Sequence, residues 1–202
     1  MPQAGRYHHG DLRAALLREA AMLLREQGVE GLSLRRLAER AGVSRTAPYH
    51  HFEDKNALLC ALAENGFRQL DGLMEHVSFQ ADDPEPGLRR FVRAYLRFAS
   101  DDPEQYELMF GRTLWKAGRP TDSLTRVAHG CFRRYVEKLD ADGLGAAALP
   151  GGGDPLRVAQ ASWATLHGLC RLLLDGIYVD QQDMEAVSDQ AVALMLAAVR
   201  TP

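Results

Sequence analysis

The sequence contains few cysteines and no long apolar run, and these absences exclude several classes of protein. Its three cysteines, Cys60, Cys131 and Cys170, are far apart and form neither a CxxC pair nor a spacing typical of zinc sites. The longest strongly apolar stretch, Ala193 to Val199, is much shorter than the roughly 18 residues that cross a bilayer. The first residues contain no apolar segment of the kind found in secretory signals. We therefore expect a cytoplasmic protein with buried free thiols and no membrane association.

The sequence also lacks the common catalytic and metal-binding motifs. It contains no GxSxG, no glycine-rich phosphate loop and no HExxH. Its two histidine pairs, His8-His9 and His50-His51, consist of adjacent residues, which do not face one another on a helix, and no third ligand is evident nearby. We therefore expect no enzymatic activity, no metal site and no cofactor.

The charge is small in total but unevenly distributed. The 202 residues have a formal net charge of −3, which by itself argues against nucleic acid as a partner. Residues 1–55 nevertheless contain nine Lys and Arg against seven Asp and Glu, together with four of the seven histidines. Residues 56–202 contain 15 basic and 20 acidic residues. The chain is thus a mildly basic N-terminal part followed by an acidic remainder.

Apolar residues recur at helical spacing along almost the whole chain, and no alternating pattern of a β-strand is present. With 46% apolar residues, the sequence predicts an all-α globular protein of about nine helices. The expected helices span about 12–28, 33–42, 44–52, 54–73, 88–100, 103–115, 121–139, 155–179 and 184–200. Residues 81–87 and 143–154 are expected to form loops because they are rich in Pro, Gly or Asp.

Local helix signals are most specific in the N-terminal quarter. Ser33, Ser44 and Asp54 are suitable N-cap residues for three successive helices. Gly42 predicts the end of the helix that begins at Ser33. Pro48 would lie near the first turn of the next helix, where proline costs less than in the middle but still removes one hydrogen bond.

The segment from Leu34 to Phe52 predicts a helix-turn-helix. A short amphipathic helix is followed by a tight turn at Gly42 and a second short helix, and the small Ala38 lets the two helices approach closely. In such a motif the second helix enters the major groove of DNA. The residues expected to face base edges are Ser44, Arg45, Thr46, Ala47, Tyr49 and His50, and those expected to contact phosphate are Arg35, Arg36, Tyr49, His51 and Lys55. The alternative is a packed helical hairpin whose arginines are merely solvated.

This segment resembles the N-terminal domain of the tetracycline-repressor (TetR) family of bacterial transcription regulators. The residues that carry the resemblance are Gly31–Ala38, Ala41–Ser44, Tyr49–Phe52, Lys55 and Leu58, roughly a quarter of the chain with the helix before them. The resemblance implies phosphate contacts by Tyr49, His51 and Lys55 and a core position for Phe52. It implies base contacts by Arg45, Thr46, Ala47 and His50. Pro48 departs from the family pattern, because many members carry a bulky apolar residue there.

The remainder resembles the ligand-binding and dimerisation domain of one branch of that family. The resemblance rests on the Trp–His–Gly signature in Ser162–Gly168 and on Pro103–Gly111. We therefore expect a helix-turn-helix DNA-binding domain at 1–55 and a helical ligand-binding and dimerisation domain at 56–202. The last two helices are apolar on two sides, so one side of each would contact a second subunit. The residues expected at this dimer interface are Leu166, Leu169, Leu173, Ala191, Met195 and Ala198. The alternative is a large monomeric core.

An effector pocket is expected among the aromatic residues of the second domain, because ligand cavities are mainly apolar with a few polar groups. The candidates are Tyr95, Phe98, Tyr106, Met109, Phe110, Trp115, Phe132, Trp163 and His167. Together these features predict a homodimeric repressor that binds an inverted-repeat operator in double-stranded DNA and is released by a small, apolar effector. Two alternatives stay open: a DNA-binding architectural or accessory protein without a small-molecule sensor, and a helical domain that no longer binds an operator.

Overall fold

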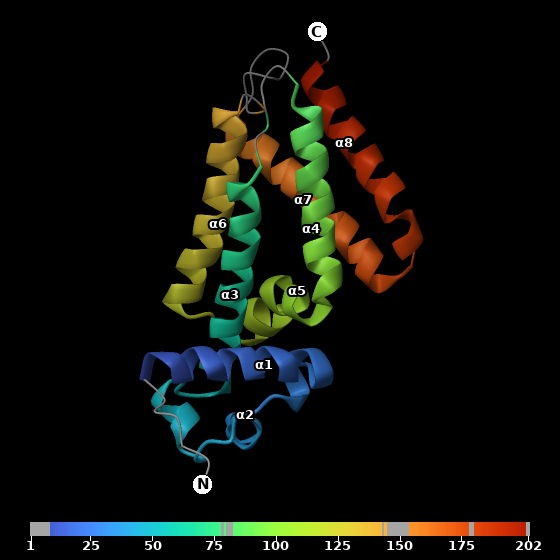
Figure 1. Cartoon of the computed structure of the whole chain (residues 1–202). Helices are drawn as coiled ribbons and strands as arrows, with labels where there is room; N and C mark the ends of the chain where they lie inside the picture. The colour runs from blue at the N-terminus through green and yellow to red at the C-terminus, as the bar shows by residue number, and fades with distance from the viewer. Residues whose placement is uncertain are drawn as a thin grey trace. The chain divides into compact units, whose positions relative to one another are not determined.

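The computed structural model describes residues 9–77, 79, 83–142, 144, 154–177 and 180–200, except for the side chains of residues 9–11, 181 and 198–200. Across these residues the chain forms eight α-helices with short 3-10 and π-helical turns and no β-strand (Figure 1). The prediction of an all-α fold is confirmed, with eight α-helices in the described part against about nine expected. None of these helices combines the length and the apolar character needed to cross a membrane. The expected loop at 143–154 lies almost entirely outside the described residues.

By its internal contacts the chain divides into two compact units. Unit 1 comprises residues 1–66 and 104–125, and it contains α1 (His9–Gly31), α2 (Leu34–Ala41), the 3-10 helix η1 (Ala47–His50), nearly all of α5 (Pro103–Phe110) and the π-helical turn η2 (Thr113–Ala117). Unit 2 comprises residues 67–103 and 126–202, and it contains α4 (Glu85–Asp101), α7 (Pro155–Asp175), the 3-10 turn η4 (Gln181–Asp183) and α8 (Met184–Arg200). Helices α3 (Lys55–Glu75) and α6 (Asp122–Ala141) begin in unit 1 and continue into unit 2.

In unit 1, α2 lies against α1 (Figure 1). The buried residues of these two helices include Leu16, Ala20, Leu23 and Leu24 of α1 and Leu34, Leu37 and Ala38 of α2. Two of the sequence signals for α2 are confirmed. The Ser33 hydroxyl accepts a hydrogen bond from the N–H of Arg36 at 3.2 Å, and Gly42 ends the helix with a left-handed φ of 66°. Gly28 also adopts a left-handed φ, of 64°, and interrupts α1 where the sequence predicts its end.

The predicted helix over 44–52 is wrong in both type and length. Only Ala47–His50 is helical, as a single turn of 3-10 helix, and the residue that precedes this turn is Thr46 rather than the expected cap Ser44. The physical reason is Pro48, which is buried and has no N–H to donate to an earlier carbonyl. The neighbouring N–H groups instead bond three residues back, as Tyr49 does to the carbonyl of Thr46 at 3.1 Å.

Two later helices end earlier than the sequence predicts. The expected helix over 103–115 stops at Phe110, and the indole N–H of Trp115, in η2, donates to the carbonyl of Met109 at 2.6 Å. That carbonyl is one that a longer α-helix would have used for its own backbone bonds. The expected helix over 155–179 stops at Asp175, because Gly176 adopts a left-handed φ of 62°.

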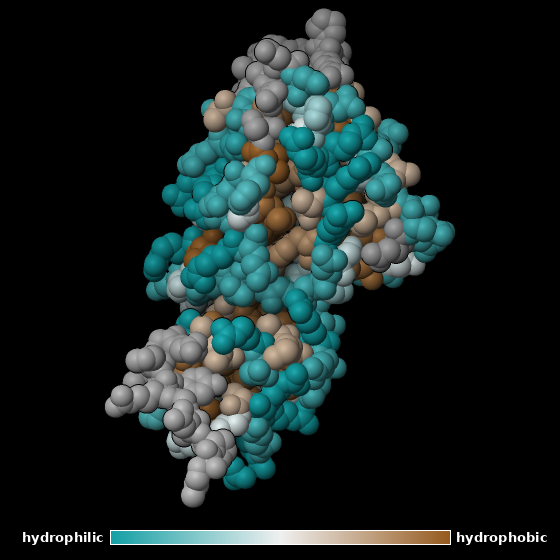
Figure 2. Space-filling view, in the orientation of Figure 1, coloured by the Kyte–Doolittle hydropathy of each residue, from teal (hydrophilic) through white to brown (hydrophobic). Residues whose placement is uncertain are grey.

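The core of unit 2 is an aromatic cluster. Phe91 of α4 stacks on Tyr135 of α6 with ring centroids 5.6 Å apart, and Trp163 of α7 meets Tyr135 edge-on at 5.0 Å. Phe79 and Phe132 extend the cluster through edge contacts with Phe91 and Trp163. Helix α4 also packs against α8 (Figure 1). Figure 2 shows teal, hydrophilic residues over most of this unit and a strip of brown, hydrophobic ones beside α4.

Candidate nucleic-acid interface

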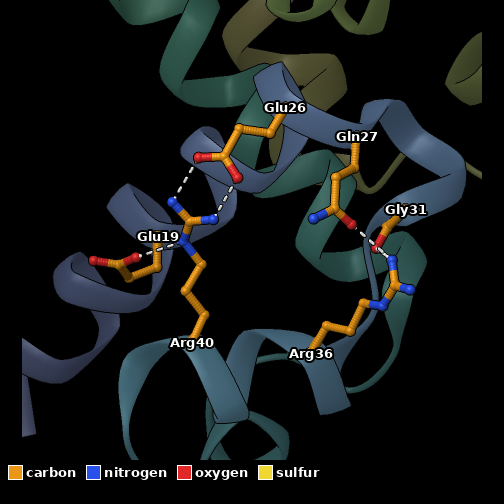
Figure 3. A network of polar contacts seen from close by, with 6 residues as sticks. All are labelled: Glu19, Glu26, Gln27, Gly31, Arg36 and Arg40. Atoms are coloured by element: carbon orange, nitrogen blue, oxygen red, sulfur yellow. Dashed lines mark hydrogen bonds and ion pairs between the residues drawn. The ribbon is translucent and has the colours of Figure 1, made fainter.

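The last turn of α2 is held to α1 by Arg40 (Figure 3). Its two terminal nitrogens donate to the two carboxylate oxygens of Glu26 at 2.5 Å and 2.7 Å, and its Nε donates to Glu19 at 3.1 Å. The hydrogen bond from Arg40 lowers the pKa of Glu26, and the hydrogen bonds to Glu26 and Glu19 raise the pKa of Arg40. A planar guanidinium fork on a carboxylate fixes direction as well as distance. Arg40 therefore sets the orientation of α2 on α1.

The first turn of α2 is tethered by a second arginine, which Figure 3 shows beside the first. Arg36 Nη1 donates to Gln27 Oε1 at 2.7 Å and to the carbonyl oxygen of Gly31 at 3.0 Å. Arg36, expected to contact phosphate, thus has one terminal nitrogen engaged within unit 1. Arg35 is more exposed and pairs with Glu39 of its own helix at 3.2 Å. Both ends of α2 are fixed to α1, and its outer face carries Arg35.

The segment after α2 presents a polar surface. Its exposed residues are Ser44, Arg45, Thr46, Tyr49 and His50, and Ala47 is half-buried between them. Tyr49 is 56% exposed although it is a large aromatic residue, and the preceding Pro48 is buried. The hydroxyls of Ser44 and Thr46 lie 3.2 Å apart and order the start of the turn. Arg45 is exposed, and no ion pair joins it to another residue that the structure describes.

The start of α3 closes this surface. Asp54 Oδ1 accepts from the N–H of Ala57 at 2.7 Å, which confirms Asp54 as the predicted N-cap. Phe52 is buried, and the guanidinium of Arg13 lies 5.4 Å from its ring centroid. His51 and Lys55 are half-buried beside it. The sequence from Val43 to Phe52 contains no acidic residue, so this part of the surface offers donors and positive charge without a carboxylate, and the exposed Glu53 and Asp54 follow it. Such a surface suits an anionic partner.

Unit 2 contains a cavity of about 520 Å³. Its walls come from α4, α6, α7 and α8, and its lining consists of Leu88, Tyr135, Leu139, Leu144, Asp154, Arg157, Val158, Ala161, Ser162, Thr165, Leu194, Met195 and Leu196. This volume lies within the range of roughly 300–1,000 Å³ that is typical of small-molecule sites. The lining is mainly apolar with a few polar groups, which is the usual character of such sites.

The nine residues expected to bind an effector do not line this cavity. Tyr106, Met109, Phe110 and Trp115 lie in unit 1, whereas Tyr95, Phe98, Phe132, Trp163 and His167 lie in unit 2. Tyr95, Tyr106 and Met109 are fully buried, and the other six are half-buried. Within unit 1, Tyr106 meets Phe110 with ring centroids 4.8 Å apart. Within unit 2, Trp163 meets Tyr95 at 5.6 Å and Phe132 at 5.5 Å.

The residues expected at a dimer interface are mostly turned inward. Leu166, Leu173 and Ala191 are buried in the single chain, Leu169 and Met195 are half-buried, and the side chain of Ala198 lies outside the described residues. Other large apolar residues of the same region are exposed instead. These are Leu156 and Leu172 of α7, Ile177 after it and Leu194 of α8. They account for four of the six large apolar residues that are exposed in the described part of the chain.

The described residues contain no group of three or more His, Cys, Asp or Glu side chains that could hold a metal ion. The three cysteines are buried thiols and not parts of disulfides. Burial, together with the nearby charge of Asp71, raises the pKa of Cys131 to about 12, so this thiol stays protonated at neutral pH.

Sequence reasoning missed two features that the structure makes prominent. Arg40 was not among the candidate residues, although Glu19 and Glu26 are seven residues apart and therefore share one face of α1. The cavity was missed because its lining is aliphatic and comes from four helices, and helical spacing alone gives no sign of how those helices enclose a space.

Two protein families match the chain. Residues 16–62 match the family described as bacterial regulatory proteins of the tetR family, and residues 88–199 match the tetracyclin repressor-like C-terminal domain. The first match contains α2, η1 and the start of α3, and the second contains most of the cavity lining.

Individual relatives agree with these matches. The tetracycline repressor protein class C of Escherichia coli is 58% identical over 52 residues, which are 26% of this chain and 24% of that protein. The chain therefore matches only about a quarter of the length of that relative. The HTH-type transcriptional repressor Rv1474c of Mycobacterium tuberculosis is 30% identical over 178 residues, which are 79% of this chain and 93% of that protein.

Solved structures show the same fold. A Rhodococcus protein described as having unknown function superposes with a TM-score of 0.81 at 33% identity, and the match covers 98% of this chain and all of that one. The TetR family transcriptional regulator PfmR of Thermus thermophilus superposes with a TM-score of 0.64 at 23% identity over 94% of this chain and 98% of that one.

Proposed function

The chain belongs to the TetR family of bacterial regulatory proteins, and from this premise we propose that it is a transcriptional repressor that binds an inverted-repeat DNA operator as a homodimer and is released by a small, apolar effector. The observation that carries the proposal is the exposed, acid-free surface at residues 44–50, on a helix-turn-helix whose first helix is fixed at both ends by Arg36 and Arg40. DNA recognition needs such a surface to be rigid, because base contacts tolerate little displacement. The protein would act in the bacterial cytoplasm, where its operator lies.

Base contacts would come from the short η1 segment. Arg45 is exposed and suits bidentate contact with guanine, while Thr46 and Ala47 suit contact with a thymine methyl group. Ser44 and His50 supply further donors and acceptors at the same surface. Because η1 is a single 3-10 turn, fewer side chains reach one groove than from a longer α-helix. The proposal therefore gives Arg45 the largest share of base discrimination.

Phosphate contacts would flank the base contacts. Tyr49, His51 and Lys55 lie along η1 and the start of α3, and the first turn of α3 also has backbone N–H groups that favour an anion. Arg35 is the exposed cation on α2. Arg36 has a terminal nitrogen engaged by Gln27 and Gly31, so its main contribution would be to hold α2 in position.

The homodimer would form through α7 and α8. Leu172, Ile177 and Leu194 expose large apolar surfaces on or beside these helices, which a second copy would cover. Leu166, Leu173 and Ala191 are buried in the single chain, so they would support this face from within and would not lie on its surface. A twofold dimer places its two reading surfaces, which are residues 44–50 of each copy, on the half-sites of an inverted repeat.

The effector would occupy the cavity of unit 2. An effector shifts the protein between a DNA-binding and a released state only if it binds the two states unequally. The cavity is built from α4, α6, α7 and α8, so a ligand in it would change the packing of the two helices that carry the proposed dimer face. A change in that packing would alter the spacing of the reading surfaces.

Selection of bound fragments from a random pool of double-stranded DNA tests the proposal. We expect enrichment of an inverted repeat whose half-sites lie about one helical turn, or a multiple, apart. Enrichment of bent or A·T-rich sequences without symmetry would instead indicate an architectural protein. No enrichment at all would indicate a helical domain that does not bind an operator, and it would overturn the proposal.

A further inference from the structure

Two hydroxyl groups of α7 line the cavity, and the hydrogens of both are occupied. Ser162 Oγ lies 2.9 Å from the carbonyl oxygen of Val158 and 3.2 Å from that of Ala159. Thr165 Oγ1 lies 3.0 Å from the carbonyl oxygen of Ala161. A carbonyl oxygen only accepts, so each hydroxyl donates to the helix backbone. What the two groups present to the cavity is therefore oxygen lone pairs.

The third polar group of the wall also has its hydrogen occupied. Tyr135 Oη lies 2.8 Å from Ser162 Oγ, and because the single Ser162 hydrogen is directed at a carbonyl, Tyr135 is the donor of this bond. Tyr135 is fully buried behind Ser162, and this burial raises the pKa of the phenol to about 12 although the bond to Ser162 opposes the rise. The Tyr135 hydroxyl thus stays protonated and donates within the protein.

The two charged groups of the lining are paired at its edge. Asp154 Oδ2 lies 3.7 Å from Arg157 Nε, and Asp154 also accepts from the N–H of Leu156 at 3.0 Å. Arg157 Nη1 donates to Gln160 at 2.7 Å. The rest of the lining is apolar, apart from the hydroxyls already described. Arg157 and Asp154 are 72% and 55% exposed, so this end of the cavity faces solvent. The end lined by Leu88, Leu139 and Leu196 is buried, and a charged group there would lose its hydration.

The cavity is also long. Its lining on α7 extends from Asp154 to Thr165, which at the helical rise of about 1.5 Å per residue corresponds to roughly 16 Å. Leu88, Leu139 and Met195 line it from the other three helices. A ligand that fills it is therefore an extended apolar chain or a narrow skeleton of similar length.

We propose that the cavity binds a neutral, elongated apolar alcohol whose hydroxyl group donates a hydrogen bond to Ser162 Oγ or Thr165 Oγ1. The inference rests on the proposed function only in treating this cavity as the effector site. It adds the chemical class of the ligand. Away from the exposed Arg157, the hydroxyl groups of Ser162 and Thr165 offer acceptors and no free hydrogen, so they select a molecule that brings its own. An ether or ketone of the same shape brings none, and a carboxylate adds a charge and further lone pairs.

Four probes that share one alkyl chain and differ at the head group test this preference. We would titrate the full-length protein, without DNA, with decanol, decyl methyl ether, decanoate and decylammonium, and measure each Kd by calorimetry at neutral pH. Loss of one hydrogen bond corresponds to about tenfold in Kd, so decanol is expected to bind about tenfold more tightly than the ether. The two charged probes are expected to bind more weakly still. Equal affinity for decanol and the ether, or tighter binding of either ion, overturns the proposal.

The variant Ser162→Ala distinguishes a direct hydrogen bond between Ser162 and the ligand from a merely structural role of Ser162. It removes one acceptor from the wall and leaves the Tyr135 hydroxyl without its partner, so that Tyr135 donates to whatever enters the space. In Ser162→Ala combined with Thr165→Val, the preference of decanol over the ether is expected to fall from about tenfold to about one, because neither acceptor remains and the freed Tyr135 hydroxyl donates to both probes alike. The control is Ser100→Ala, in which the removed hydroxyl also donates to a carbonyl four residues back, that of Leu96 at 2.9 Å, but lies outside the cavity lining. Retention of the preference in Ser162→Ala and in Ser162→Ala combined with Thr165→Val overturns the assignment of these oxygens.

The proposed function and this inference can fail separately. If decanol binds with the expected preference but leaves the affinity for the selected DNA unchanged, the ligand class stands and the effector role fails. If the protein protects an inverted repeat but none of the four probes binds, the repressor proposal stands and the ligand class is overturned.

Discussion

Arg40 and Glu26 form a two-point ion pair across the interface between α2 and α1, with N–O distances of 2.5 Å and 2.7 Å. The two residues are fourteen positions apart in the sequence. Their ion pair holds the last turn of α2, the first helix of the helix-turn-helix, against α1. Glu19 completes the site from about two turns earlier in α1. In the proposed function none of these three residues contacts DNA, so their effect on binding would act through orientation.

Arg40→Met is expected to lower both the melting temperature and the operator affinity. The change leaves Glu19 and Glu26 facing one another without a cation, and α2 loses the contact that fixes its last turn. Because Arg40 would not contact phosphate, the dependence of binding on salt concentration is expected to keep its slope. The control for the melting temperature is Arg35→Met, which removes an exposed pair within one helix and is expected to leave the value near that of the wild type. An unchanged melting temperature in Arg40→Met would contradict the tethering role.

The same ion pair predicts a dependence of stability on pH. The pKa of Glu26 is lowered in the folded state from its ordinary value of 4.5, chiefly by the hydrogen bond from Arg40. Ionised Glu26 therefore contributes fully to the stability of the fold above pH 4.5, the ordinary pKa of the group. This contribution is lost as the pH falls through the lowered pKa that Glu26 has in the folded state. Urea unfolding of the wild type and of Arg40→Met, followed from neutral pH downward, is expected to show a difference in midpoint that shrinks below pH 4.5. A difference that stays constant over this range would show that another contact carries the effect.

Lys55→Ala and Arg45→Ala are expected to impair DNA binding in different ways. Loss of a phosphate contact at Lys55 weakens binding almost uniformly across sequences and lowers the salt slope by about one unit. Loss of a base contact at Arg45 is expected to cost about 1–3 kcal/mol on the preferred site and to relax the preference at one position of each half-site. Fluorescence anisotropy on the selected operator and on single-base variants measures both. Identical effects of the two substitutions would count against the division between phosphate and base contacts.

Leu172→Asp is expected to shift the homodimer toward monomers. The charge would lie on the exposed apolar face of α7 and would remain unpaired in a dimer that buries this face. Met22→Asp is a matched control, because Met22 has the same exposed fraction as Leu172, 37%, but lies on α1 in unit 1. Analytical ultracentrifugation of the three proteins at equal concentration compares their masses. Equal dimer content in both variants would place the interface away from Leu172.

Gly42→Ala and Gly72→Ala are expected to change stability in opposite directions. A Cβ atom would meet nothing within 4 Å at either position, so steric contact plays no part. Gly42 has a φ of +66°, where a residue with a Cβ costs about 1–2 kcal/mol. Gly72 lies inside α3 without a positive φ, and alanine there is expected to stabilise the helix by about 0.5–1 kcal/mol. Urea denaturation measures both changes, and a destabilised Gly72→Ala would contradict this reasoning.

The local features of the helix-turn-helix follow from its residue types alone. Ser33, Gly42 and Asp54 have the capping roles that their residue types predict, and Gly28 interrupts α1 as expected. These features depend on the backbone of a few neighbouring residues, and that backbone is set by the presence or absence of a Cβ atom or a short polar side chain. The all-α class follows for the same reason, because helical spacing repeats within each segment.

The tertiary structure decided which groups meet across distant parts of the chain. Helical spacing shows that Tyr95 and Leu166 lie on apolar faces, but only the packing of α4, α6, α7 and α8 decides that both are buried in the core while Ser162 and Thr165 line the cavity. It also placed Arg40 within hydrogen-bond distance of Glu26. The physical reason is that burial and ion pairing depend on what covers a side chain, and the covering residues come from segments that sequence spacing does not connect.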